Sequence, residues 1–151
     1  MAVDVIIRAA REQDHEALAQ LAEQLGYPST PEAIRARLRL LTAHPEHHVL
    51  VAEHGRAGGR AEVLGFLHVL LHPSLVYDKA AEVASLVIDD AHRGNGIGQA
   101  LMESAEQWAR MQGCSVLRLR SNAVRTRAHS FYTRLGYEQW KTSLAFRKQL
   151  E

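Results

Sequence analysis

The chain has 151 residues, of which 46% are hydrophobic and 23% charged, a composition typical of a globular domain and not of a disordered or fibrous protein. The formal net charge of +1 gives no long-range attraction to nucleic acid, and no apolar run approaches the roughly 20 residues that cross a bilayer. We therefore expect one domain over residues 1–151 with neither nucleic acid nor membrane as a partner. Cys114 is the single cysteine and the N-terminal stretch lacks a signal-peptide pattern, which together favour a cytoplasmic protein.

Short β-branched runs and helical periodicities alternate along the chain. The first half predicts a strand, two helices and a hairpin of two strands, at residues 3–10, 14–27, 29–41, 47–53 and 62–71. The second half predicts strand, helix, strand, helix and a closing strand, at residues 82–89, 96–112, 115–121, 127–136 and 137–150. Asp14 and Thr30 are candidate caps at the starts of the first two helices. This order predicts the α/β class, with a mixed sheet and flanking helices.

Residues 93–98, RGNGIG, connect an apolar strand to a helix. They do not match a P-loop, because no lysine follows the glycines, nor a dinucleotide fingerprint, because Gln99 stands where the third glycine belongs. The first N–H groups of the following helix are unpaired and carry partial positive charge, and glycines let a diphosphate approach them closely. Arg93 adds a full positive charge. We predict a pyrophosphate site here, and the alternative is a tight turn whose glycines serve only its left-handed backbone conformation.

RGNGIG resembles the Q/R-x-x-G-x-G/A acetyl-CoA motif of the GNAT (GCN5-related) N-acetyltransferases. The likeness extends over nearly the whole chain, through IIRAAREQDHEALAQL, AEVASLVID and SNAVRTRAHSFYTRLGY. The C-terminal part is particularly similar to the branch of aminoalkylphosphonate and other small-amine N-acetyltransferases. The resemblance implies a mixed, mostly antiparallel sheet that is splayed between its fourth and fifth strands, here Glu82–Ile88 and Ser115–Ser121.

The resemblance also implies how acetyl-CoA would bind as co-substrate. The backbone of the fourth strand would pair with the pantetheine amides like an added strand, and the glycine loop would hold the pyrophosphate. Asn122 and Tyr132 would lie near the thioester. The implied acetyl-CoA-binding residues are Leu86, Val87, Ile88, Arg93, Gly94, Asn95, Gly96, Ile97, Gly98, Gln99, Asn122 and Tyr132.

Acetyl transfer to a primary amine of a small molecule needs a base and an acid. An alkylammonium has a pKa near ~10.4 and must lose a proton, while the leaving thiolate, whose thiol has a pKa of about 8.5, must be stabilised or protonated. Glu82 is the candidate base, and His68, His92 and His129 are its rivals. Tyr132 is the candidate acid, and the family resemblance favours this function over simple packing.

The identity of the acceptor stays open. A phosphonate or other acidic acceptor would need basic partners, and an aminoglycoside would need acidic ones; the candidates are Arg35, Arg37, Arg39 and Lys79 for the first, and Glu46, Asp78, Glu82 and Asp89 for the second. A peptide or protein N-acetyltransferase and a non-catalytic acyl-CoA-binding sensor are alternative functions. The histidine-rich stretch at residues 44–48 lacks the spacing of zinc motifs, so no metal is expected. A homodimer is expected because members of the family often form dimers.

Overall fold

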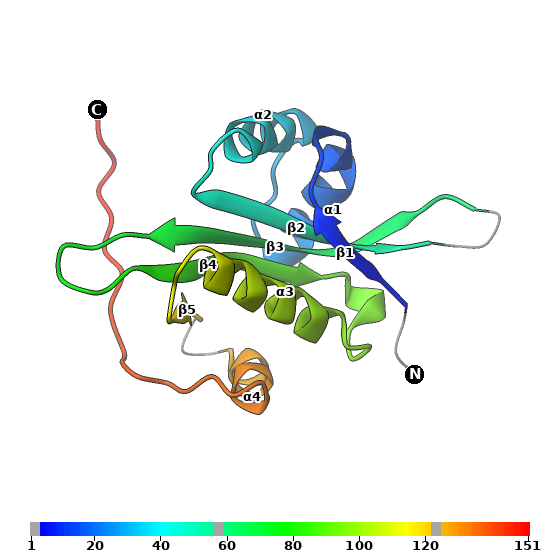
Figure 1. Cartoon of the computed structure of the whole chain (residues 1–151). Helices are drawn as coiled ribbons and strands as arrows, with labels where there is room; N and C mark the ends of the chain where they lie inside the picture. Colours follow the sequence, from blue (N-terminus) through cyan, green and yellow to red (C-terminus); the bar gives the residue numbers. More distant parts are fainter. Residues whose placement is uncertain (1–3, 56–58, 122–124) are drawn as a thin grey trace. The chain divides into compact units, whose positions relative to one another are not determined.

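The computed structural model describes residues 4–55, 59–121 and 125–151. The described residues form two compact units, one ending at Arg120 and the other running from Ser121 to Glu151. The first unit contains five strands, three α-helices and two short 3₁₀ turns, in the order β1 (Ile6–Ala9), η1 (Glu12–Asp14), α1 (His15–Leu25), α2 (Pro31–Thr42), β2 (His47–His54), β3 (Glu62–His72), β4 (Ala80–Ile88), η2 (Asp90–His92), α3 (Ile97–Met111) and β5 (Leu117–Leu119) (Figure 1). The second unit contains α4 (Thr126–Arg134). Whether both units act as one domain stays a prediction.

The sheet of the first unit has the strand order β1-β2-β3-β4-β5. Neighbouring strands are antiparallel from β1 to β4, and β5 runs parallel to β4. Helices α1 and α2 cover one face of the sheet and α3 covers the other (Figure 1). Leu18, Leu21 and Leu38 pack against Val49 and Val51 on the first face, because each helix presents its apolar residues at helical spacing. The predicted α/β class with a mixed sheet and flanking helices is confirmed.

Strand β4 pairs with β5 over only part of its length. Their register joins Ala81 through Val83 to β5, whereas Ser85 through Ile88 have partners on β3 alone within the described chain. The β3–β4 register also shifts beside His68, which leaves Ala84 opposite no residue of β3. This confirms the predicted splay between the fourth and fifth strands.

The helix ends follow the local sequence with one exception. Thr30 Oγ1 accepts a hydrogen bond from the Ala33 N–H at 3.1 Å, as predicted for a cap, and Gly26 ends α1 with a φ of 99°.

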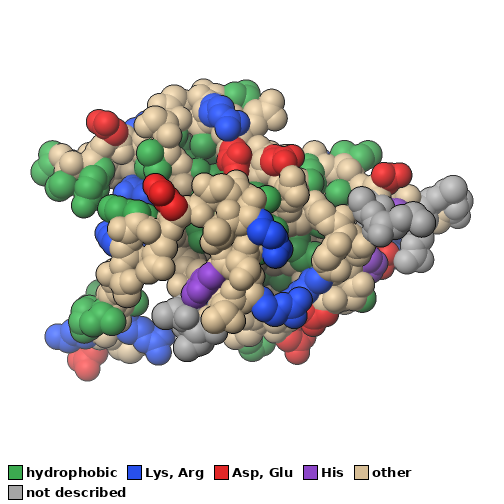
Figure 2. Space-filling view, turned by 90° about the horizontal axis from the view of Figure 1, so that it is seen from below, with side chains coloured by type: hydrophobic (Ala, Val, Ile, Leu, Met, Phe, Trp, Pro, Cys, Tyr) green, Lys and Arg blue, Asp and Glu red, His purple; other side chains and the backbone are tan. Residues whose placement is uncertain are grey.

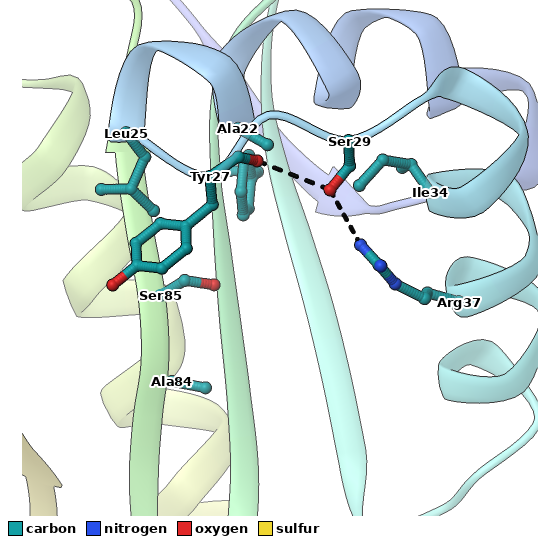
Figure 3. Close-up of a pocket in the computed structure, with 9 residues that line it drawn as sticks. Ala22, Leu25, Tyr27, Ser29, Ile34, Arg37, Ala84 and Ser85 are labelled. Atoms are coloured by element: carbon teal, nitrogen blue, oxygen red, sulfur yellow. Dashed lines mark hydrogen bonds between the residues drawn. The ribbon is translucent and has the colours of Figure 1, made fainter. Parts of the chain in front are cut away.

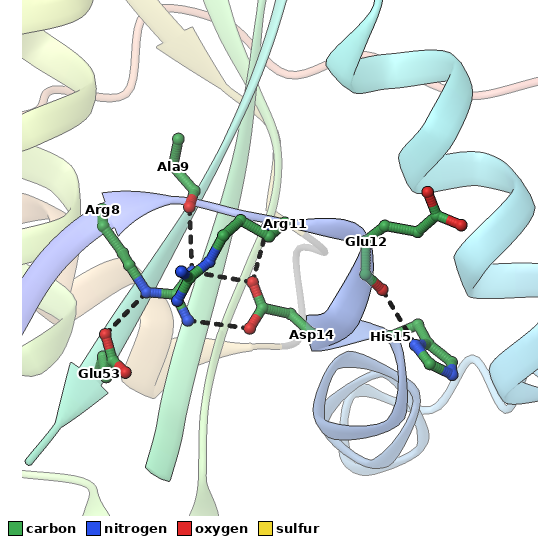
Figure 4. Close-up of polar contacts among 7 residues, drawn as sticks. All are labelled: Arg8, Ala9, Arg11, Glu12, Asp14, His15 and Glu53. Carbon is green, nitrogen blue, oxygen red and sulfur yellow. Dashed lines mark hydrogen bonds and ion pairs between the residues drawn. The ribbon is translucent and has the colours of Figure 1, made fainter. Parts of the chain in front are cut away.

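Asp14 does not cap α1 with its side chain. Its carboxylate accepts two hydrogen bonds from Arg8, both 2.9 Å, and one from the Arg11 N–H at 2.7 Å (Figure 4). Asp14 thus occupies the predicted N-cap position of α1, but its carboxylate makes the stronger, charge-assisted bidentate pair with Arg8 in place of a bond to a helix amide.

The predicted closing strand was wrong, because residues 137–151 have no strand pairing. Their pattern favours a strand, but a strand needs a partner edge for its N–H and C=O groups. The described part of the second unit contains a helix and no strand, so it offers none.

The described residues contain no helix that is both long and apolar enough to cross a membrane. In the view of Figure 2, basic and acidic side chains are interspersed and neither sign forms a continuous field. The expectation that nucleic acid is not a partner stays a prediction.

Candidate functional site

The connection between β4 and α3 is held in place by the side chain of Gln24 on α1. Gln24 Nε2 donates to Asp89 Oδ1 at 2.9 Å, and Gln24 Oε1 accepts from the Asp90 N–H at 2.9 Å. His92 Nδ1 lies 2.6 Å from Asp89 Oδ2. These hydrogen bonds, first that from Gln24 and then that from His92, lower the pKa of Asp89 below its ordinary value. His92 therefore supports the start of the loop through Asp89.

The glycine loop adopts a backbone that requires glycine at two of its three glycine positions. Gly94 and Gly96 have φ values of 80° and 81°, in the left-handed region that disfavours residues with a Cβ. A Cβ at either position would meet no atom within 4 Å, so the space around both is open. Asn95 Nδ2 donates to the His92 carbonyl at 3.0 Å, and Arg93 pairs with Asp90 at 2.8 Å. Both the turn and the pyrophosphate interpretation are compatible with this geometry.

The N-terminus of α3 has no side chain capping it. Gly96 is the N-cap, the first turn contains no acidic residue, and the first intrahelical bond runs from the Ala100 N–H to the Gly96 carbonyl at 3.1 Å. The N–H groups of Ile97, Gly98 and Gln99 thus precede the helical ladder and have no acceptor within the helix. With Arg93 nearby in the chain, the residues present suit a bound diphosphate.

One edge of β4 is open beside this loop. Leu86, Val87 and Ile88 pair with β3 on one side, and on the other side no residue of the described chain pairs with them in the sheet. Backbone groups at such an edge bind an extended ligand with amide groups by adding it as a further strand. Pantetheine, with its two amides, has this chemistry.

A cavity of about 340 Å³ lies between the helices α1 and α2 and the strands β3 and β4 (Figure 3). Its apolar wall is formed by Ala22, Leu25, Ile34 and Phe66. Its polar groups come from Tyr27, Ser29, Arg37 and Ser85, and Ala84 at the register shift of β4 completes the lining. The cavity therefore reaches the part of β4 where pairing with β5 has ended.

Arg37 extends from α2 into this space (Figure 3). Its Nη1 donates to Ser29 Oγ at 3.0 Å, and the Ser29 hydroxyl in turn lies 3.5 Å from the Tyr27 carbonyl. Sequence reasoning did not single out Tyr27, Ser29 or Ser85. The Tyr-Pro-Ser-Thr stretch between the two helices marks a connection, but nothing in it indicates which side chains face the sheet.

The candidate bases lie in different surroundings. Glu82 on β4 is half-buried, and its Oε1 is 3.5 Å from Arg120 Nε. His68 on β3 is opposite Ser85 of β4 and hydrogen-bonds His47, with 2.9 Å between their ring nitrogens. Burial and, to a lesser extent, the charge of His47 lower the pKa of His68 to about 4, so His68 is neutral at physiological pH. Among the described residues, no group of three or more His, Cys, Asp or Glu side chains is placed to hold a metal ion.

Two predicted residues lie outside the first unit. Tyr132 is half-buried on α4 in the second unit, with its ring edge-on to that of Phe131. Burial raises the pKa of its phenol, against a smaller opposing effect of the Arg125 charge. Asn122 lies outside the described residues, as do its neighbours Ala123 and Val124. The first unit thus contains the glycine loop, the open β4 edge, Glu82 near the start of β4 and the cavity, and the approach of Tyr132 and Asn122 stays a prediction.

A model of the acetyltransferase (GNAT) family matches residues 6–137. The chain belongs to the GNAT acetyltransferase family. Among curated relatives, it is 26% identical over 132 residues to mycothiol acetyltransferase of Saccharopolyspora erythraea, covering 77% of this chain and 42% of the relative. It is 41% identical over 58 residues to aminoalkylphosphonate N-acetyltransferase of Salmonella typhimurium, covering 38% of each. The matched region is therefore about two fifths of the length of these two GNAT relatives.

Solved structures share the GNAT fold over nearly the whole chain. A crystal structure of a transcriptional regulator from Bacillus halodurans has a TM-score of 0.83 at 25% identity, covering 96% of this chain and all of that one. An aminoglycoside 6'-N-acetyltransferase from Acinetobacter haemolyticus has a TM-score of 0.79 at 17% identity, covering 97% and 99%. Aminoglycoside N-acetyltransferase AAC(6')-Iy, solved in complex with CoA, has a TM-score of 0.83 at 16% identity, covering 99% and 98%. The last two show the fold alone.

Proposed function

We propose that this GNAT chain transfers the acetyl group of acetyl-CoA to a primary amine of a small molecule, by direct attack in a ternary complex. The observation that carries the proposal is the continuity of β4 and α3. The open edge at Leu86–Ile88 is followed after a short loop by the uncapped amides of Ile97–Gln99. An extended ligand with two amides and a pyrophosphate at one end matches both features in order.

The chain's own groups have distinct tasks in this proposal. Arg93 and the amides of residues 97–99 hold the pyrophosphate, and the backbone of Leu86–Ile88 pairs with pantetheine. Acetyl-CoA supplies the activated acyl group. The N–H of Val87 or Ile88 donates to the carbonyl oxygen as negative charge develops on it.

The proton transfers are assigned to Glu82 and Tyr132. The ammonium group gives a proton to Glu82, directly or through water, and the free amine nitrogen then forms a bond to the acyl carbon. The carbon–sulfur bond breaks, Tyr132 donates its phenolic proton to the leaving thiolate, and the second proton that the nitrogen loses on becoming an amide restores the phenol. The phenol, whose pKa burial raises above its ordinary value near ~10, is protonated at neutral pH. His68 is the rival base on the same stretch of sheet, since it lies opposite Ser85 and is neutral.

The names of the curated relatives support a small-molecule acceptor. They include, besides the two above, glucosamine 6-phosphate N-acetyltransferase 1 of Oryza sativa, 28% identical over 110 residues. A peptide or protein acceptor is the second candidate, and a sensor that binds acyl-CoA without turnover is the third. A cytoplasmic location stays a prediction.

One experiment separates these functions. The purified protein is incubated with acetyl-CoA and with free amines, peptides or no acceptor, and CoA thiol release and acetylated product are measured. The proposal expects amine-dependent release with a product about 42 mass units heavier, because an acetyl group replaces one hydrogen of the amine. Acetyl-CoA binding without amine-dependent release would support the sensor, and a preference for peptides over free amines would support the second candidate.

A further inference from the structure

Two of the three arginines of α2 share one partner, and the third has another. Arg35 and Arg39 lie one turn apart, and both donate to Glu12 Oε1, at 2.7 and 2.6 Å. Arg37 is on a different side of the helix, lines the cavity and donates to the neutral hydroxyl of Ser29. In the described chain no carboxylate pairs with Arg37. The helix therefore directs one unneutralised guanidinium to the cavity and keeps the other two away from it.

No acidic side chain is among the described residues that line this cavity. One of the acids that an aminoglycoside would need is already engaged elsewhere, because Asp89 accepts hydrogen bonds from Gln24 and His92. A polycationic acceptor would thus meet a positive charge in the cavity and no acidic side chain in its lining to offset that charge, which is unfavourable.

Lys79, the remaining basic candidate, is also in use. Its Nζ donates to the Gln112 carbonyl at 2.8 Å, at the C-terminal end of α3. Of the four basic residues that sequence reasoning could not choose between, only Arg37 lines the cavity.

We propose that the acceptor carries an acidic group as well as its amine, and that Arg37 is the specificity-determining residue that binds this group. The acidic group is a carboxylate, phosphonate or phosphate, whose oxygens match the planar donors of a guanidinium. Leu25, Ile34 and Phe66 contact the carbon chain between the two ends of the acceptor. The amine is directed to Ala84 and Ser85, at the register shift of β4. This inference rests on the proposed function, whose acyl donor lies along the same strand.

Steady-state kinetics with matched acceptors test the proposal. The acceptors share a two- or three-carbon amine and differ at the other end: 2-aminoethylphosphonate and β-alanine are anionic, ethanolamine and propylamine are neutral, and 1,3-diaminopropane is cationic. For the wild type we expect kcat/KM at least about tenfold higher for the anionic amines, the scale of one charge-assisted contact. Arg37→Gln should lower kcat/KM for the anionic amines at least tenfold, mainly through KM, and change it less than twofold for the neutral amines. Arg39→Gln, which removes a guanidinium of the same helix outside the cavity, is the control and should change neither.

Binding measurements keep this inference separate from the proposed function. Calorimetry titrates 2-aminoethylphosphonate and ethanolamine into the CoA-loaded wild type and Arg37→Gln proteins. Binding of the phosphonate that depends on Arg37, without turnover of any amine, would support the anion site and overturn the proposed reaction. Turnover with equal losses for neutral and anionic amines in Arg37→Gln, or a preference for the diamine, would overturn the anion site and leave the reaction intact. Neither turnover nor Arg37-dependent binding would overturn both.

Discussion

The side-chain amide of Gln24 donates a 2.9 Å hydrogen bond to the carboxylate of Asp89, although the two residues lie 65 positions apart. The same amide accepts a hydrogen bond from the Asp90 N–H. One side chain of α1 thus satisfies the backbone and the carboxylate that lead from β4 into the glycine loop. The helix that borders the acceptor cavity is in this way connected to the segment proposed to bind the pyrophosphate.

Replacing Gln24 should therefore weaken acetyl-CoA binding without removing any group that touches it. Gln24→Ala leaves Asp89 and the Asp90 N–H without this partner, and we expect a stability loss of about 1–2 kcal/mol. The dissociation constant for acetyl-CoA, measured by calorimetry, should rise about three- to tenfold, which corresponds to ~1 kcal/mol. Gln20→Ala, at an exposed position of the same helix, is the control. Unchanged affinity in Gln24→Ala would show that the loop keeps its conformation without the amide.

Asparagine at Gly96 separates the two explanations of the glycine loop. Asparagine tolerates the left-handed conformation better than most residues, and its Cβ would meet no protein atom within 4 Å. Gly96→Asn should thus retain most of the stability. If a diphosphate lies on the amides that follow, the side chain should still obstruct it and weaken acetyl-CoA binding at least about tenfold, or ~1.4 kcal/mol. Wild-type affinity in a folded Gly96→Asn protein would leave only the turn explanation.

The sequence predicted those features of the fold that depend on local pattern. Leu18 and Leu21 of α1 and Leu38 of α2 lie on the apolar helix faces that the sequence predicts and are buried, and Gly113 follows α3 with a φ of 82°. The side chain of Asp14 was misplaced because its choice between a helix amide and Arg8 depends on how β1 and α1 meet. The C-terminal residues have a strand pattern, but whether they form a strand depends on an edge that local sequence does not specify.

The candidate site likewise has one part that local sequence predicts and another that only the packing of the elements determines. The glycine loop is contiguous in sequence and could be found from RGNGIG alone. The cavity is assembled from residues of α1, α2, β3 and β4, so its lining follows from packing and not from any motif. The spacing of Arg35, Arg37 and Arg39 shows that they cannot all face one pocket. Only the position of Glu12 in the folded chain reveals that Arg35 and Arg39 are the two that face away from the cavity.

Tyr132→Phe should lower turnover much more than cofactor affinity. The variant keeps the ring that packs on Phe131 and removes only the hydroxyl proposed to protonate the thiolate. We expect kcat to fall about 10²-fold, the scale of general acid catalysis, with the acetyl-CoA dissociation constant within about twofold of wild type. Glu82→Gln should cause a comparable fall in kcat because glutamine accepts no proton from the amine. Full activity in both variants would remove the catalytic assignment and make His68→Gln the next variant to assay.

The ion pair of Asp14 with Arg8 should make the stability depend on acid pH. Burial by itself would raise the pKa of Asp14, but hydrogen bonds from Arg8 and from the Arg11 N–H outweigh it and lower the pKa. A lowered folded-state pKa means that the stabilisation is fully present above the unfolded pKa of about 3.9 and is lost as the pH falls through the folded value. Asp14→Asn should lose about 1.5–3 kcal/mol at pH 7, and its deficit relative to wild type should shrink below pH ~4.

Urea denaturation at pH 7 and at pH 3 measures both quantities for Asp14→Asn. Glu16→Gln is the matched control, since Glu16 is exposed on α1. A deficit that stayed constant between the two pH values would show that the loss arises from packing and not from the charge of Asp14.

The C-terminal segment should pair with a second copy of the chain. Leu144, Phe146 and Leu150 are all at even-numbered positions, which would put their side chains on one face of a strand. These side chains are 80–89% exposed. Exposed apolar residues on one face of a strand favour pairing with the edge of another strand, and two copies can exchange such segments symmetrically.

We expect light scattering to give twice the monomer mass of 16.9 kDa at micromolar concentration. Replacing Leu144 and Phe146 by Ser should yield monomers, whereas Lys141→Ser with Arg147→Ser, on the alternate positions, should not. A monomeric wild type would contradict this assignment, and a dimer unaffected by the Leu144 and Phe146 changes would place the interface elsewhere.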